Sequence, residues 1–212
     1  MTHASRVAGV DGCKGGWLAA LDGGGEVEFQ VHRDFRSVLS LDASIIGVDI
    51  PIGLPHSEPR RADLLARTFV GPRWQSVFVT PPRAVLEAET HADATALCVK
   101  LTGKGVSQQA FALRMRILEV DELASGDRRV VEVHPEVSFR ALAGRPLPSK
   151  HTPEGKSARR ELLGLDTAAV RPALEKDALD AAIVAWTANR IAAGVAETLP
   201  DNPQPGEPTI TY

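Results

Sequence analysis

Short apolar runs separated by glycine clusters dominate the first part of the chain. The segments 7–10, 17–21 and 26–31 are apolar or alternate apolar with polar residues, and glycines at 12–16 and 23–25 separate them. Alternation with a period of two is typical of strands, and such short turns join antiparallel neighbours. The pattern therefore predicts a three-stranded antiparallel meander.

The next elements are a short helix and a fourth strand. Asp34 suits the N-cap of a helix that carries Phe35, Val38 and Leu39 on one side. Residues 44–50 are apolar at successive positions, which is typical of a strand covered on both faces of a sheet.

The middle of the chain changes to helical spacing. Helices are predicted over 60–70, stopped by the Gly-Pro pair that follows, and over 107–126, with a short extended piece at 76–79. A strand over 129–134, broken by Pro135, follows this part.

The remaining sequence predicts a basic loop over 145–160 and an alanine-rich helix over about 174–197. We expect a single domain over 1–199 with a helical insertion over about 55–126, between the fourth and fifth strands. The proline-rich residues 200–212 are expected to form a tail that wraps the surface or moves freely.

Composition excludes several classes of protein. The chain has 212 residues, is 43% hydrophobic and carries a net charge of −3, which argues against a disordered chain and against a globally cationic one. No run of eighteen apolar residues and no secretory segment is present, so we expect a cytoplasmic protein with no membrane contact. Cys13 and Cys98 alone cannot form a disulfide scaffold or a cysteine-rich zinc site.

The strongest chemical signal is a repeated strand ending. Residues 7–11 and 45–49 both end in Gly-Val-Asp, at Asp11 and Asp49. If the two strands are adjacent and parallel, about 4.8 Å apart, their carboxylates lie side by side and can share the ions of a two-metal site. In the alternative interpretation, each aspartate merely ends a strand and caps the following turn.

A second acidic pair lies near the start of the last helix. Asp177 and Asp180 are three residues apart and share a helix face; alternatively, they only complement the helix dipole. Small alanines around them would let the helix press onto the sheet. Burying several carboxylates together is costly without cations, so the pattern favours Mg²⁺ or Mn²⁺ bound by Asp11, Asp49, Asp177 and Asp180.

The fifth predicted strand adds two candidates. Alternation sends Glu132 and His134 to the same side. Glu132 would complete the acidic cluster, and His134 would assist proton transfer or product release. The alternative is an exposed strand face with a satisfied histidine, and for His134 alone we favour this alternative.

These acids on the first strand, the fourth strand and the last helix resemble the ribonuclease H-like superfamily. The sequence is most similar to the domain of unknown function 429 family, described as predicted nucleases of that fold. The resemblance covers nearly the whole chain and is carried by these motifs: Gly9–Trp17, Gly47–Pro55, Arg61–Arg67, Ser76–Phe78, Glu132–Glu136 with Ser138–Phe139, Ser149–Lys150, Glu154–Lys156, and Asp177 with Asp180. It implies an α/β fold with a mixed five-stranded sheet flanked by helices.

The expected function is metal-dependent hydrolysis of phosphodiester bonds by a two-metal carboxylate mechanism. Nucleic acid would be held through local basic patches, with Lys14, Arg67, Lys150 and Lys156 as candidate phosphate contacts; scattered cations are otherwise an ordinary solvated surface. One alternative is an actin- or sugar-kinase-like phosphotransferase or ATPase, since a glycine-rich hairpin follows Asp11. A non-catalytic binding module of the same fold is the other. The sequence does not indicate an oligomeric state.

Overall fold

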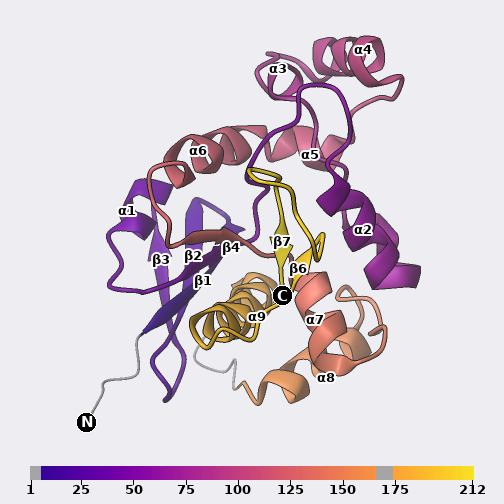
Figure 1. The fold of residues 1–212 in the computed structure, drawn as a ribbon. Coiled ribbons are helices and arrows are strands. Elements are labelled where there is room, and N and C mark those ends of the chain that lie inside the picture. The colour runs from indigo at the N-terminus through magenta and orange to yellow at the C-terminus, as the bar shows by residue number, and fades with distance from the viewer. Residues whose placement is uncertain (1–5, 166–173) are drawn as a thin grey trace.

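A computed structural model of the chain describes residues 6–165 and 174–212. Its centre is a five-stranded mixed sheet in the order β3-β2-β1-β4-β5 (Figure 1). The strands are β1 (Val7–Cys13), β2 (Gly16–Asp22), β3 (Glu28–His32), β4 (Ile46–Val48) and β5 (Val130–Glu132). β1, β2 and β3 form the predicted antiparallel meander, whereas β4 and β5 run parallel to β1. This arrangement confirms the predicted fold class and is consistent with a ribonuclease H-like fold.

The register brings equivalent positions of the parallel strands together. Gly9 lies opposite Gly47, and Val10 opposite Val48; Val48 lies opposite Glu132 on the other side. Because parallel strands run toward the same edge of a sheet, the residues that follow Val10 in β1 and Val48 in β4 lie at the same level.

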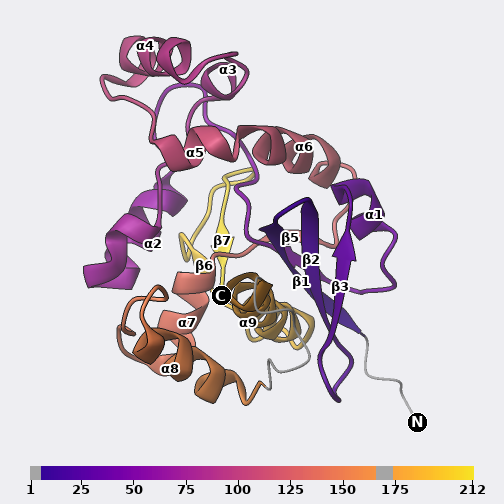
Figure 2. The same cartoon turned by 180° about the vertical axis from the view of Figure 1, so that it is seen from behind.

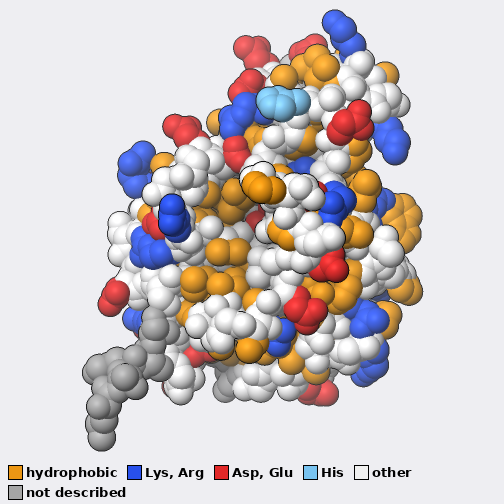
Figure 3. All heavy atoms as spheres, in the orientation of Figure 1, with side chains coloured by type: hydrophobic (Ala, Val, Ile, Leu, Met, Phe, Trp, Pro, Cys, Tyr) orange, Lys and Arg blue, Asp and Glu red, His pale blue; other side chains and the backbone are white. Residues whose placement is uncertain are grey.

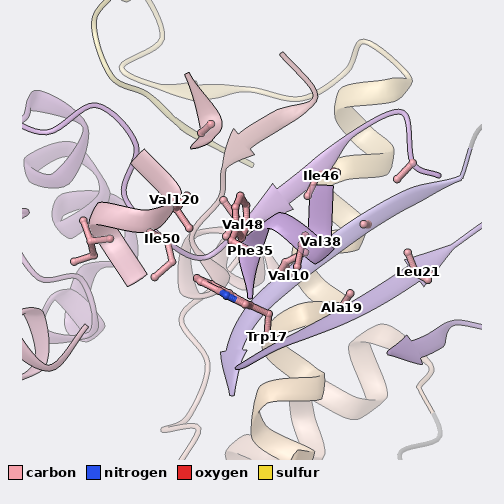
Figure 4. Packing of buried hydrophobic residues seen from close by; sticks show 14 of the residues in the cluster. Val10, Trp17, Ala19, Leu21, Phe35, Val38, Ile46, Val48, Ile50 and Val120 are labelled. Carbon is pink, nitrogen blue, oxygen red and sulfur yellow. The ribbon is translucent and has the colours of Figure 1, made fainter. Parts of the chain in front are cut away.

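Helices cover both faces of the sheet (Figures 1 and 2). α9 (Glu175–Ala192) lies on one face, and α1 (Phe35–Leu39) with α6 (Arg114–Ala124) lies on the other. Between the sheet and α1, the rings of Trp17 and Phe35 pack in an edge-type geometry with centroids 5.1 Å apart (Figure 4). Asp34 caps α1 as predicted, since its carboxylate accepts the Ser37 N–H.

The opposite face is built from very small residues. A Cβ atom added at Gly9 would lie 2.0 Å from the backbone nitrogen of Ala185 in α9, so only glycine fits there. Ala181, Ala182 and Ala185 are buried against the sheet. The alanine-rich composition of α9 therefore lets its backbone approach β1, as the sequence suggests.

The segment between β4 and β5 forms a helical insertion. Its elements are α2 (Arg61–Val70), the 3-10 helix η1 (Gly71–Ser76), α3 (Arg83–Leu86), α4 (His91–Thr102), α5 (Gln108–Ala112) and α6. α3 and α4 project at the top of the view in Figure 1. The single helix predicted over 107–126 is two helices here, divided at Leu113, although Ser107 caps its start as expected.

Toward the end of the chain, the structure adds one helix that was not predicted and corrects two sequence-based expectations. Pro135 begins a helix, α7 (Pro135–Ala143), because proline is favoured in the first helical turn. The predicted loop over 145–160 contains α8 (Pro153–Leu163), capped by Thr152. α9 ends at Ala192, five residues before the predicted end.

The last residues fold back onto the domain. β6 (Thr198–Leu199) pairs with β7 (Ile210–Thr211), and Thr211 also bridges to Val133 beside β5. Tyr212 is buried and packs against Phe69. The proline-rich segment over 200–212 thus has an exposed middle and a buried end. No helix within 6–165 and 174–212 combines the length and the apolar character needed to cross a bilayer.

Candidate active site

Two aspartates stand where the parallel strands β1 and β4 reach the edge of the sheet. Asp11 lies within β1, and Asp49 directly follows β4. The Asp49 N–H donates to the Val10 carbonyl at 3.0 Å, which fixes the two residues at one level. Asp11 is buried and Asp49 is partly buried. This is the side-by-side arrangement that the repeated Gly-Val-Asp ending predicts.

The first turns of α9 bring two more carboxyl groups to this edge. Asp180 is 2% exposed, and its Oδ2 accepts a hydrogen bond of 2.7 Å from Lys150 Nζ. Its Oδ1 is buried without a hydrogen-bond partner in the described part of the chain. Asp177 is partly buried, one turn earlier. We call Asp11, Asp49, Asp177 and Asp180 the acidic cluster.

The members of the acidic cluster influence one another electrostatically. Burial raises the pKa of Asp11 well above its ordinary value, and the charges of Asp180 and Asp49 raise it further. Burial also raises the pKa of Asp49, although His134 opposes this shift and Asp180 adds to it. For Asp177, burial is again the main cause of a raised pKa. The cluster therefore holds its negative charge at an energetic cost.

Among the described residues, two lysines form ion pairs with the cluster, and Lys150 is the less exposed of them. Burial lowers the pKa of its ammonium group, but attraction to Asp180 and Asp49 outweighs burial, so the pKa lies above its ordinary value. Lys150 thus remains charged at neutral pH. The Lys176 ammonium group also lies 3.7 Å from an Asp177 oxygen, so two ammonium groups face four carboxyl groups and the acidic groups remain in excess.

The loop that carries Lys150 is itself fixed by a buried ion pair. Arg159 of α8 donates to the Pro148 carbonyl at 2.9 Å and to the Glu136 carboxylate at 2.7 and 3.0 Å. Arg159 and Glu136 are both buried. Sequence reasoning missed this pair, because Glu136 lies beyond Pro135 and Arg159 lies in a segment predicted to be a loop.

The acidic cluster matches a divalent cation in its chemistry. Carboxylate oxygens are the ligands that Mg²⁺ and Mn²⁺ prefer, and Asp180 Oδ1 offers an unpartnered one. Within 6–165 and 174–212, however, no three side chains of His, Cys, Asp or Glu are already arranged around a common metal position. The four aspartates supply suitable ligand atoms and negative charge. In this structure, Asp180 Oδ2 is paired with Lys150.

Glu132 does not complete the cluster as predicted. Its carboxylate accepts hydrogen bonds of 2.7 and 2.8 Å from the Arg60 guanidinium group and one of 2.7 Å from the Ile52 N–H. Arg60 also pairs with Asp63, whose other oxygen accepts the Thr80 N–H. Because these groups are buried and mutually satisfied, Glu132 holds the start of α2 against β5. In the sequence, the three-residue spacing of Arg60 and Asp63 could have indicated that these two residues form an ion pair.

His134 lies beside the acidic cluster. It precedes α7, and its Nδ1 is buried without a partner among the described residues. A cavity of about 70 Å³ is lined by His134, Asp49, Lys150 and Glu132, together with residues of the insertion. His134 is therefore placed to interact with a molecule bound at Asp49.

The predicted basic contacts are dispersed. Lys14 is exposed in the β1–β2 turn, Lys156 pairs with Glu175 at 3.5 Å, and the Arg67 guanidinium carbon lies 4.4 Å from the ring centroid of Trp74. Of the four candidates, Lys150 alone has a contact with the acidic cluster. On the face shown in Figure 3, acidic and basic side chains are interspersed.

Comparison with known proteins gives one match. The model of a family described as "Protein of unknown function (DUF429)" matches residues 9–205, which is most of the chain and includes every member of the acidic cluster. No curated protein and no solved structure matches the chain.

Proposed function

The chain belongs to the DUF429 family, and we propose from the chemistry of its site that it hydrolyses phosphodiester bonds of nucleic acid with Mg²⁺ or Mn²⁺. The observation that carries this proposal is the acidic cluster. Two aspartates at matched positions of parallel strands meet two from the start of α9, and burial and mutual repulsion raise the pKa of three of them. Sites with this excess of buried negative charge are typical of cation binding.

Each residue has a role that follows from its position. Asp11, Asp49 and Asp180 would hold the ions, with Asp177 at the rim. When bound, such ions lower the pKa of water and stabilise the charge that develops on phosphate and leaving oxygens. Lys150 places a positive charge beside the substrate phosphate, and the unpartnered Nδ1 of His134 accepts or donates a proton next to Asp49.

The test is cleavage of labelled single-stranded, duplex and hybrid oligonucleotides in the presence of Mg²⁺ or Mn²⁺. We expect Asp11→Asn to reduce the rate by at least about 100-fold, because substitutions in the outer shell of metal sites already cost 10- to 100-fold. Asp42→Asn is the matched control, since Asp42 is exposed outside the cluster, and it should cleave like the wild type. Equal rates for wild type and Asp11→Asn, or no cleavage of any substrate with either ion, would overturn the proposal.

A further inference from the structure

A second, larger cavity lies in the helical insertion. It has a volume of about 620 Å³ and is bounded by α2, η1, the segment 77–82 and the α4–α5 connection. Apolar side chains of Leu64, Trp74 and Phe78 line it, and Gln75, Ser107 and Gln109 add polar groups. A cavity of this volume, lined by apolar side chains and a few polar groups, is typical of a binding site for a small organic molecule or for part of a larger molecule.

Trp74 is the unusual member of this lining. Its side chain is 46% exposed although it is large and apolar. The Arg67 guanidinium group lies over its ring at 4.4 Å from the centroid, a cation–π contact that orients the ring. Leu64, 48% exposed, lies in the same cavity wall. The cavity thus presents an oriented aromatic ring to whatever enters it.

This cavity and the one at the acidic cluster share part of their walls. Val77, Phe78, Thr80 and Gln109 line both, and the smaller cavity also contains Asp49, Lys150 and His134. The Trp74 cavity therefore lies directly beside the cavity that Asp49 and Lys150 line. Gln109 also lines a third cavity, of about 270 Å³, with Ser76 and Lys150.

The charges around these cavities suit an anionic chain. Arg67 and Lys104 line the Trp74 cavity, and Arg73 lines the third one. None of the three forms an ion pair with a side chain in the described part of the chain. Cations beside an exposed aromatic ring are the combination by which proteins hold single-stranded nucleic acid, since the ring stacks on a base and the cations contact phosphates.

We propose that the Trp74 cavity binds an unpaired base of a single-stranded nucleic acid, and thereby presents a neighbouring phosphodiester to the acidic cluster. This inference rests on the proposed hydrolysis and names its substrate class. A base within a duplex has both faces covered by its neighbours, so it cannot stack on Trp74 unless it is extruded. The site therefore selects single strands, or the unpaired bases of loops and bulges.

The test measures binding separately from cleavage. The anisotropy of a fluorescein-labelled single-stranded oligonucleotide is titrated with the protein in EDTA, where metal-dependent cleavage is absent. Trp74→Ala should weaken binding about 5- to 100-fold, since base–aromatic stacking has that worth, and Trp74→Phe should recover most of it. Met115→Ala is the control, because Met115 is 66% exposed on α6 outside the cavity, and it should bind like the wild type. The duplex of the same sequence should bind more weakly.

The outcomes separate this inference from the proposed function. If the protein cleaves nucleic acid but Trp74→Ala leaves single-strand binding and KM unchanged, the base site is wrong and the hydrolysis stands. If single strands bind through Trp74 but nothing is cleaved with either ion, the hydrolysis is wrong and the base site stands. Self-association that Trp74→Ala abolishes, without oligonucleotide binding, would show that the cavity is an interface between copies and would overturn the inference.

Discussion

The aspartates of the acidic cluster are placed where their charge opposes folding. Asp11 is buried and its pKa is raised by burial and by the charges of Asp180 and Asp49. Lys150 relieves part of this cost by its ion pair with Asp180. Residues that destabilise the fold are retained where they serve a function. Substitutions in the cluster should therefore change the free energy of unfolding as well as the activity.

The pH dependence of stability tests this cost at Asp11. Above about pH 4 the unfolded chain releases a proton that the folded Asp11 still holds, so wild-type stability falls as the pH rises from there through the raised pKa of the folded state. Asp11→Asn lacks this loss. We expect the variant to unfold at a higher urea concentration than the wild type at pH 7, and this difference should shrink as the pH falls toward 4.

Adding Mg²⁺ provides the matched comparison for that experiment. A cation bound by the folded wild type stabilises it by mass action, whereas Asp11→Asn should gain much less. A variant that is less stable than the wild type at neutral pH, with a gap that does not depend on pH, would contradict the account of Asp11.

At the scale of elements, the close approach of α9 to β1 positions half of the cluster. Gly9 lies directly under the backbone of Ala185, and the start of the same helix carries Asp177 and Asp180. Any side chain at Gly9 would push the helix away from the sheet. Both the stability of the core and the position of the two aspartates therefore depend on this glycine.

Gly9→Ala should destabilise the protein by about 3 kcal/mol or more, because the added methyl group meets backbone atoms that cannot move aside independently. Gly25→Ala is the control, since a Cβ atom there meets nothing within 4 Å; it should shift the free energy of unfolding by less than about 0.5 kcal/mol. Urea denaturation followed by circular dichroism measures both. Equal stability of the two variants would show that α9 does not lie against β1 as described.

The buried Arg60 network is the second contact between elements that the site needs. It joins the start of α2 to β5 through Asp63 and Glu132. Arg60→Met should cost about 3–5 kcal/mol, because it leaves two buried carboxylates unpaired. The neighbouring Arg61→Met should cost less than about 1 kcal/mol, since Arg61 is 44% exposed in its pair with Glu207. If thermal unfolding shows a similar loss of stability for both variants, the pairing of Glu132 with Arg60 is wrong. Glu132 would then again be a candidate member of the acidic cluster.

At the scale of the whole molecule, local patterns predicted the sheet and the acidic cluster well. The repeated Gly-Val-Asp ending placed Asp11 and Asp49 together because register and direction in a parallel sheet follow from few rules. The helix of Asp177 and Asp180 followed from its alanines. The pairing of Glu132 with Arg60 could not be predicted from such a pattern. Alternation indicates which face of a strand a residue occupies, but not which distant residue packs against it.

The insertion and the chain end depended on contacts that no local pattern contains. α3 and α4 pack with α5 into a small core of their own, around Val85, Cys98 and Ala110. β7 is only two residues long, and it pairs with β6 and bridges to Val133. Elements this short derive their stability from tertiary packing rather than from propensity. The Trp74 cavity lies among these elements, so no local pattern singled out Trp74.

Anomalous X-ray diffraction from crystals soaked in Mn²⁺ would show whether the acidic cluster binds divalent cations. We expect an anomalous peak at metal–oxygen bonding distance from Asp11, Asp49 and Asp180, with the Lys150 ammonium group moved away from Asp180 Oδ2. Crystals of Asp11→Asn treated in the same way should show a weaker peak or none. A wild-type map with no peak at the cluster, in which Lys150 keeps its ion pair with Asp180, would contradict the claim.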